Sequence, residues 1–140
     1  MALLEKHLYV KKSQLPKAGK GLFTRIFIPK GTLIVEYKGR RCKWKEVKDE
    51  HDNGYIFHIN NNKVINALPY KKALARYAND ARGLGRVKGL NNNSWYVIDG
   101  DKVYIESKKD IPAGSEIFVD YGKEYWDIVK ENIKVDKKKK

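Results

Sequence analysis

The residues best suited to chemistry lie in segment 111–126, which reads IPAGSEIFVDYGKEYW. A turn at its Pro and Gly is followed by Ile117 and Val119 at alternate positions, which predicts a strand that ends at Tyr121. A glycine follows at once, and an aromatic pair comes three residues later, Tyr125 and Trp126. This order can place a phenol in a pocket with an aromatic wall. An edge strand with an apolar end is the alternative.

A second tyrosine follows a similar segment. Residues 28–39 read IPKGTLIVEYKG and share the opening Ile-Pro-x-Gly, then Thr or Ser, with residues 111–117. Tyr37 comes nine residues after its isoleucine and Tyr121 comes ten after its own. Because strand side chains alternate, this difference can turn the two tyrosines to opposite faces, so that they converge from different strands. Two ordinary turn–strand units are the alternative.

The elements that must position these tyrosines are short strands separated by turns, which predicts a mainly β domain with few short helices. A Gly-x-Gly pair in the loop at 16–23 lets the backbone approach a ligand, although a simple turn explains it as well. The other expected elements are a first strand with Tyr9, Val10 and Leu15, hairpins at 55–67 and 95–106, helical turns at 42–50 and 71–78, and a short helix near 127–131.

Composition limits the classes of protein. The chain has 140 residues, of which 41% are hydrophobic, and this fits one folded domain, expected at 1–133. Its single cysteine, Cys42, excludes an internal disulfide and a cysteine-cluster zinc site, and three scattered histidines form no metal pattern. No apolar run is long enough to span a membrane and no secretion signal is visible, so we expect an intracellular protein.

The chain carries a formal charge of +13. Residues 134–140 (KVDKKKK) are expected to form a disordered basic tail. The basic body is compatible with nucleic acid or chromatin, and equally with a lysine-rich soluble surface. Nucleic-acid binding and a homodimer both remain open from composition.

Five segments, taken in order, resemble the SET domain of protein lysine methyltransferases. They are AGKGLF at 18–23, EYKG at 36–39, RYAND at 76–80, NNN at 91–93 and GSEIFVDYG at 114–122. The resemblance implies a set of small β-sheets in which the C-terminal segment threads beneath a loop, as chains rarely do. It also implies S-adenosylmethionine as cofactor, and a target lysine that enters a narrow channel from the opposite face.

The resemblance also implies roles for individual residues. The catalytic tyrosine matches Tyr121, and Tyr37 matches a second tyrosine that lines the lysine channel. Val119 and Tyr125 fall in the same channel, and Val119 stands where many members carry a larger aromatic residue that limits the number of methyl groups. The cofactor would be held by Ala18, Gly19, Lys20, Asn79, Asp80, Tyr121 and Trp126.

Three departures from the family are visible. The family usually has Asn-His-Ser-Cys where this chain has Asn79, Asp80, Ala81 and Arg82, so an aspartate replaces the histidine. The asparagine that follows closely in the family corresponds here to Asn92 or Asn93, after an insertion of glycines and basic residues. The cysteine-rich zinc segment of many members is absent, as in small viral and bacterial members.

Methyl transfer to lysine needs a neutral amine. A free lysine has a pKa of ~10.4, so deprotonation at pH 7 costs about 4.6 kcal/mol. An apolar channel lowers this pKa by desolvation, and an approaching sulfonium lowers it further. Tyr37 and Tyr121 supply hydroxyls without a charge that would stabilise the ammonium form, so alignment becomes the main contribution.

The resemblance implies a protein substrate, with a histone as the leading candidate, and a cytoplasmic or chromatin-associated location. A basic peptide would be repelled by the basic body unless the channel mouth is acidic. The acidic stretch Glu46, Asp49, Glu50 and Asp52 could line that mouth, or it could be a solvated helix face. A catalytically inactive cofactor-binding module and a basic β-domain that binds nucleic acid are the alternative functions.

Overall fold

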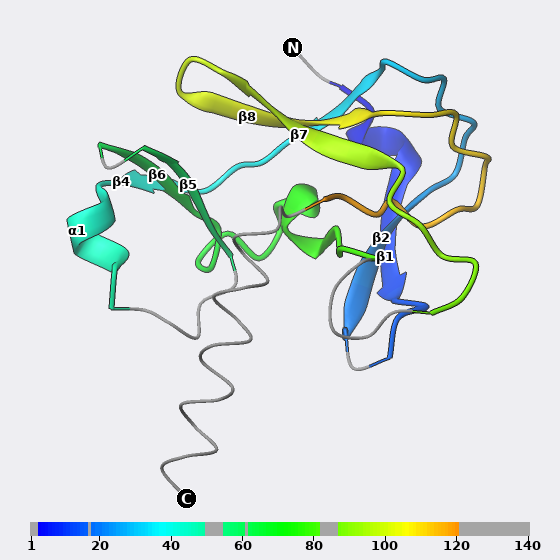
Figure 1. Ribbon diagram of the computed structural model, residues 1–140, viewed down its shortest axis with the longest axis horizontal. Coiled ribbons are helices and arrows are strands. Elements are labelled where there is room, and N and C mark those ends of the chain that lie inside the picture. The colour runs from blue at the N-terminus through cyan, green and yellow to red at the C-terminus, as the bar shows by residue number, and fades with distance from the viewer. Residues whose placement is uncertain (1–2, 17, 50–54, 61, 82–86, 121–140) are drawn as a thin grey trace, which may run out of the picture.

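The computed structural model describes residues 3–16, 18–49, 55–60, 62–81 and 87–120. Its strands form three small antiparallel sheets (Figure 1). None of the helices within these ranges has the length and apolar character needed to cross a membrane. The first sheet pairs β1 (Leu8–Lys12) with β2 (Lys20–Thr24). The second sheet has the order β3 (Leu33–Glu36), β8 (Lys102–Ser107), β7 (Ser94–Asp99), and the third has the order β4 (Arg40–Cys42), β6 (Lys63–Asn66), β5 (Ile56–Asn60). The helices in the described ranges are η1 (Glu5–His7), α1 (Trp44–Val47) and η2 (Leu74–Tyr77).

The predicted mainly β architecture with few short helices is confirmed, as are both hairpins and the helical turns at 42–50 and 71–78. The predicted helix near 127–131 lies outside the described residues. Two boundaries are wrong. Leu15 lies beyond β1, and β2 begins at Lys20, inside the predicted loop at 16–23. The glycines there suggested a loop, but β2 needs Gly21, because a Cβ at this position would lie 2.3 Å from the buried carboxylate of Glu116.

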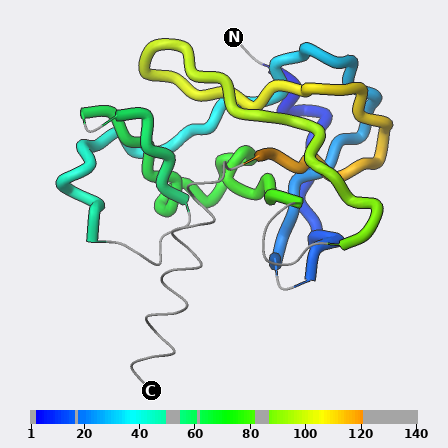
Figure 2. Tube along the Cα trace, in the orientation of Figure 1, coloured from blue at the N-terminus to red at the C-terminus, as the bar shows by residue number. Residues whose placement is uncertain are grey.

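The segment 116–120 is not the regular strand that its alternation predicts. It makes single bridges instead: Glu116 with Phe23 in antiparallel sense, Phe118 with Asn79 and Val119 with Ser94 in parallel sense. Its neighbours are β2, Asn79 after η2 and the first residue of β7, so no continuous ladder forms. Figure 2 shows this last described segment, in orange, running back into the middle of the molecule beside the green segment that holds η2.

The two Ile-Pro-x-Gly segments bind each other. The amide of Ile28 donates to the carbonyl of Ile111 at 2.8 Å, and the amide of Ile111 donates back to the carbonyl of Ile28 at 2.8 Å. The glycines of both turns are left-handed, with φ of 82° at Gly31 and 83° at Gly114, a conformation that glycine adopts without steric cost. The sequence similarity therefore reflects two equivalent turns set back to back in antiparallel sense.

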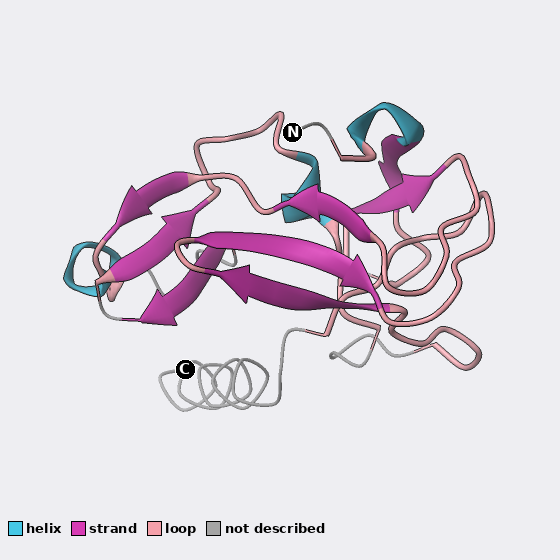
Figure 3. Cartoon of the chain, turned by 90° about the horizontal axis from the view of Figure 1, so that it is seen from above, coloured by secondary structure: helices cyan, strands magenta, loops and turns pink. Residues whose placement is uncertain are grey.

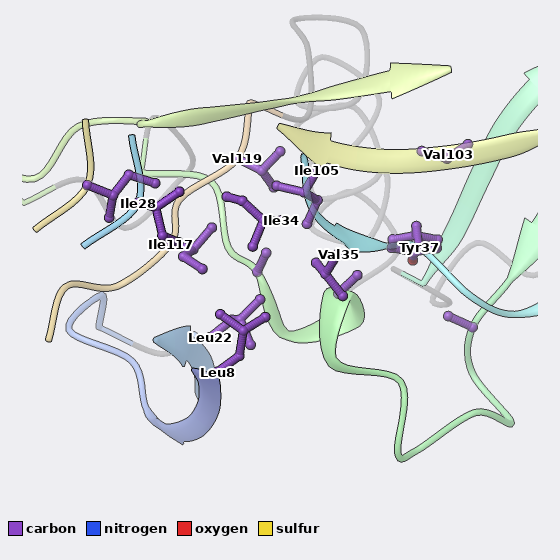
Figure 4. Packing of buried hydrophobic residues seen from close by; sticks show 14 of the residues in the cluster. Leu8, Leu22, Ile28, Ile34, Val35, Tyr37, Val103, Ile105, Ile117 and Val119 are labelled. Atoms are coloured by element: carbon purple, nitrogen blue, oxygen red, sulfur yellow. The ribbon is translucent and has the colours of Figure 1, made fainter. Parts of the chain in front are cut away.

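The three sheets share one apolar core, although Figure 3 shows them as separate small ribbons. Figure 4 shows side chains from all parts of the chain meeting in it. Each fully buried aliphatic side chain contributes about 1.5–3 kcal/mol relative to exposure. The labelled members are Leu8, Leu22, Ile28, Ile34, Val35, Tyr37, Val103, Ile105, Ile117 and Val119. Residues 116–120 pass between Asn79 and Ser94, and we call them the threaded segment. Because Ile117 and Val119 belong to the core, apolar burial as well as hydrogen bonding fixes this segment.

Candidate active site

The loop from Ser13 to Lys20 closes on itself and borders a cleft. The amide of Ser13 donates to the carbonyl of Gly19 at 2.8 Å, so the loop ends are joined. The cleft has a volume of about 670 Å³ and is lined by Lys12, Ser13, Gln14, Leu15, Pro16 and Gly19. At Gly19 a Cβ would meet no atom within 4 Å, so the backbone faces open space there. Of Ala18, Gly19 and Lys20, which were predicted to hold the cofactor through their main chain, Gly19 lines this cleft and Ala18 packs inward against Leu15; the predicted role of all three stays a prediction.

Asn79 is brought next to this loop. Its side-chain amide donates to the carbonyl of Lys20 at 3.0 Å, at the point where β2 begins. Its own carbonyl accepts the amide of Val119 at 2.8 Å. Asn79 therefore joins the start of β2, next to the loop that borders the cleft, to the segment 116–120. The structure thus places the RYAND, AGKGLF and GSEIFVDYG motifs side by side.

Asp80 is buried, with 4% of its surface exposed, and pairs with Asn92. The side-chain amide of Asn92 donates to Oδ1 of Asp80 at 2.8 Å, and Oδ1 of Asn92 accepts the amide of Ala81 at 2.8 Å. The pair joins the two ends of the insertion, and its members are 12 residues apart in the sequence. We call this pair, with its bond to Ala81, the Asp80–Asn92 clamp.

Asn93 bonds directly to the threaded segment. Its side-chain amide donates to the carbonyl of Glu116 at 2.9 Å, and its Oδ1 accepts the amide of Phe118 at 3.0 Å. Beyond it, the amide of Asp120 donates to the carbonyl of Ser94 at 3.3 Å. The two candidate asparagines after the insertion thus have different tasks. Asn92 ties the flanking segments together, and Asn93 holds the segment between them.

Sequence reasoning missed Glu116. This carboxylate is 1% exposed, and it accepts hydrogen bonds from Oγ of Ser13 at 2.6 Å and from the amide of Gln14 at 2.9 Å. A charge at an inward position of an otherwise apolar segment is the signal that could have found it, because a buried carboxylate requires donors around it. Through Glu116, the segment before Tyr121 holds the start of the loop that borders the cleft.

Tyr37 lies in an aromatic cluster on the other side of the site. Its side chain is 5% exposed, and its hydroxyl donates to the carbonyl of Tyr55 at 2.8 Å. The ring of Tyr96 meets it edge-on at 6.0 Å, and the ring of Phe57 lies 5.8 Å away. Phe57 and Tyr96 also contact each other at 4.7 Å. The ring of Tyr37 therefore packs against rings from β5 and β7, while its hydroxyl proton is directed at a backbone acceptor.

Arg76 supports this cluster and was also missed. Its guanidinium lies 4.0 Å from the centre of the Tyr55 ring, and Nη1 donates to the carbonyls of Ala67 and Leu68, at 2.9 Å each. Arg76 thus fixes Tyr55, whose carbonyl orients the hydroxyl of Tyr37. In the sequence it appeared only as the first letter of the RYAND motif.

The remaining predicted residues divide into two groups. Val119 is fully buried in the shared core, so its predicted channel role stays a prediction. Tyr121, Tyr125 and Trp126 lie outside the described residues, as do Glu50 and Asp52 of the acidic stretch and the tail at 134–140. Of the acidic residues that the structure describes, Asp49 is exposed, and Glu46 accepts the amide of Lys43 at 2.5 Å, at the start of α1.

Small sheets, with a late segment threaded between two loop ends beside a cleft, define a SET-type fold. The chain belongs to the SET domain family, whose model matches residues 19–122. The predicted fold class is therefore confirmed.

Known relatives extend beyond this chain. It is 29% identical over 135 residues to the histone-lysine N-methyltransferase set-17 of Caenorhabditis elegans, and the match covers 94% of this chain and 46% of that protein. It is 29% identical over 144 residues to the histone-lysine N-methyltransferase EZH2 of Chaetomium thermophilum, covering 91% of this chain and 9% of that protein. The chain thus spans less than half the length of either relative.

A solved structure shares the fold. A humanized mutant of the Chaetomium thermophilum Polycomb Repressive Complex 2, bound to an inhibitor, contains a chain that is similar to this one with a TM-score of 0.67 and 29% identity. The similarity covers 86% of this chain and 15% of that chain.

Proposed function

We propose that this protein is a protein-lysine methyltransferase that uses S-adenosylmethionine. The observation that carries the proposal is the threaded segment 116–120, which brings three motifs into contact beside an open cleft. The family match and the activities of the two histone-lysine methyltransferases to which the chain is similar support it. Nucleic-acid binding and homodimer formation stay predictions.

The cleft side is proposed to hold the cofactor. Main-chain groups of Ala18, Gly19 and Lys20 would contact it, with the side chain of Asn79 beside them, the buried Asp80 behind Asn79, and Tyr121 and Trp126 as further contacts. The open space at Gly19 fits this role, because a side chain there would occupy the approach to the backbone. When bound, S-adenosylmethionine supplies an electrophilic methyl group next to a positive sulfur.

The aromatic side is proposed to receive the lysine. Tyr37, Phe57 and Tyr96 offer an apolar wall that favours the neutral amine by desolvation. The hydroxyl proton of Tyr37 is directed to the carbonyl of Tyr55, so its oxygen can accept a hydrogen bond from the amine. Tyr121, one residue beyond the described chain end at Asp120, would align the amine with the methyl group from the other side.

The substrate is proposed to be a lysine in a protein, with a histone as the leading candidate, and the location nuclear or chromatin-associated. The similarity to two histone-lysine N-methyltransferases favours a histone as substrate. Valine at position 119 is smaller than the aromatic residue that many members carry, so we expect more than one methyl group on the product lysine. Mass spectrometry of the product gives the number of methyl groups directly.

Calorimetric titration with S-adenosylmethionine, followed by mass spectrometry of histones and basic peptides incubated with protein and cofactor, tests the proposal. We expect binding in the cleft and lysine methylation. Asn79→Ala should weaken cofactor binding, whereas Tyr70→Phe, at a tyrosine that is 46% exposed, is the matched control.

Two other outcomes separate the alternatives. Cofactor binding without transfer to any protein lysine would favour the inactive module. A folded sample that binds no cofactor at millimolar concentration would refute the proposed function.

A further inference from the structure

Asp80 occupies the position at which this chain departs from its family, and the structure gives it a specific partner. Its carboxylate accepts the side-chain amide of Asn92 at 2.8 Å, and both residues are 4% exposed. The same Asn92 accepts the amide of Ala81 through Oδ1 at 2.8 Å. Two side chains thus close a ring across an insertion of ten residues, 82–91.

The clamp stands between the two segments that enclose the threaded chain. On one side, the carbonyl of Asn79 accepts the amide of Val119 at 2.8 Å. On the other side, the carbonyl of Phe118 accepts the amide of Ser94 at 3.0 Å. Asp80 directly follows Asn79 and Asn92 lies two residues before Ser94, so their bond links the two walls.

Apolar packing connects the clamp to the cleft. Ala81 packs with Leu15 and Phe118 in a small buried cluster, to which Ala18 and Leu90 add partly buried side chains. A displacement at Ala81 therefore moves the contact with the loop that borders the cleft and the contact with the threaded segment together. Because the clamp is buried, bulk solvent cannot replace its hydrogen bonds when one of them is lost.

We propose that the Asp80–Asn92 clamp is a positioning device that fixes the threaded segment 116–120 relative to the cleft. Asp80 then acts through Asn92 and not through its charge on a ligand. The inference rests on the proposed function only in taking the cleft as the cofactor site. It concerns the chain's own geometry, so it can be measured without cofactor.

An exchange of the two side chains gives a direct test. Asn92→Asp places two carboxylates at hydrogen-bond distance in a buried site, where they repel each other and the amide donor is lost. Asp80→Asn keeps one acceptor oxygen for Asn92, while it removes the charge and replaces the second carboxylate oxygen by an amide donor. The double variant Asp80→Asn with Asn92→Asp rebuilds the pair in reverse, and the carboxylate introduced by Asn92→Asp can still accept the amide of Ala81.

Amide hydrogen exchange at Val119 and Asp120 is the first measurement, made on the protein without cofactor. We expect Asn92→Asp to lose at least about tenfold in protection at both amides, Asp80→Asn to stay within about threefold of wild type, and the exchanged pair to recover most of the loss. A Val64→Ala variant is the matched control, because Val64 is buried in a separate cluster with Cys42 and Val47. It should lower the melting temperature without a selective loss at the two amides.

Cofactor affinity and kcat are the second measurement. We expect Asn92→Asp to lower cofactor affinity and kcat more than Val64→Ala does, when each variant is measured at the same number of degrees below its own melting temperature. The double variant should recover both. If Asp80→Asn alone loses as much cofactor affinity as Asn92→Asp and the exchange rescues nothing, Asp80 acts by its charge and the inference is overturned. Unchanged protection in Asn92→Asp overturns it too, and if that variant does not fold, Asn92→Ala takes its place with the same criteria. If the wild-type protein has no methyltransferase activity, the proposed function is refuted. The amide hydrogen exchange of the variants still tests the positioning role of the clamp.

Discussion

Replacing Glu116 tests whether one buried carboxylate joins the threaded segment to the cleft. Glu116→Ala removes the acceptor of the Ser13 hydroxyl at 2.6 Å and of the Gln14 amide at 2.9 Å. The side-chain amide of Gln14 lies at 3.4 Å, too long to add much. The carboxylate is 1% exposed and Ser13 is buried, so the Ser13 hydroxyl stays buried in the variant, whereas Gln14 is exposed and its amide can bind water instead.

The magnitude follows from these contacts. A hydrogen bond to a charged group contributes about 1.5–3 kcal/mol, and leaving its buried partner unsatisfied costs about 1–3 kcal/mol. With the Ser13 hydroxyl left buried and unpaired and the Gln14 amide open to water, we expect Glu116→Ala to lose about 2–4 kcal/mol in the free energy of unfolding. Glu116→Gln keeps one acceptor oxygen for Gln14, and the Ser13 hydroxyl can rotate to accept from the new amide. We therefore expect a loss of about 1–2 kcal/mol for that variant.

Urea unfolding followed by circular dichroism measures both losses, and calorimetry measures cofactor affinity in the folded fraction. Glu106→Gln is the matched control, because Glu106 accepts an exposed hydrogen bond from Nε1 of Trp95 at 2.8 Å and should lose less than about 0.5 kcal/mol. Equal stability of Glu116→Ala and the Glu106→Gln control would show that the Glu116 contacts contribute nothing, and the reasoning would fail.

Three further predictions concern the proposed reaction. Tyr37→Phe removes the bond to the Tyr55 carbonyl, and we expect about 1 kcal/mol lower stability and a kcat about 10- to 100-fold lower, whereas Tyr70→Phe should change neither; a wild-type kcat would make Tyr37 a packing residue. Tyr121→Phe should lower kcat about 100-fold, or about 2.7 kcal/mol, while calorimetry finds cofactor affinity nearly intact. Reversing Asp49 and Glu50 to lysine should raise the KM for a basic peptide, and an unchanged KM would remove the acidic stretch from the channel mouth.

Local elements were predictable from local pattern. The hairpin β7–β8 follows from an Asp-Gly turn between alternating residues, and such a signal depends on few neighbours. The boundary of β2 was not predictable in the same way. Gly21 resembles a loop residue until the carboxylate of Glu116, far along the chain, is seen to occupy the space of its side chain.

The motifs of the site were predictable, but the hydrogen bonds between them were not. The resemblance named Tyr37 and Asn79 as site residues. In the structure, Tyr37 donates to the carbonyl of Tyr55 and Asn79 donates to the carbonyl of Lys20. That Asn92 would pair with Asp80, and Asn93 with the backbone of Phe118, follows only from the threading of the chain. Such partners lie well apart in the sequence, and no periodicity along the chain encodes their distance.

The threaded segment has a consequence for how the protein is made. Residues 116–120 leave the ribosome after both loop ends that enclose them, and domains form as the chain emerges. The walls at Asn79 and Ser94 must therefore be synthesised before the segment that fills the space between them, and Ile117 and Val119 complete the core only when it docks. Docking joins contacts of long sequence separation, which slows folding. A nascent chain interrupted before residue 116 would have every strand from β1 to β8 and an unfinished core, so such chains should be recognised and degraded by the cell's proteases.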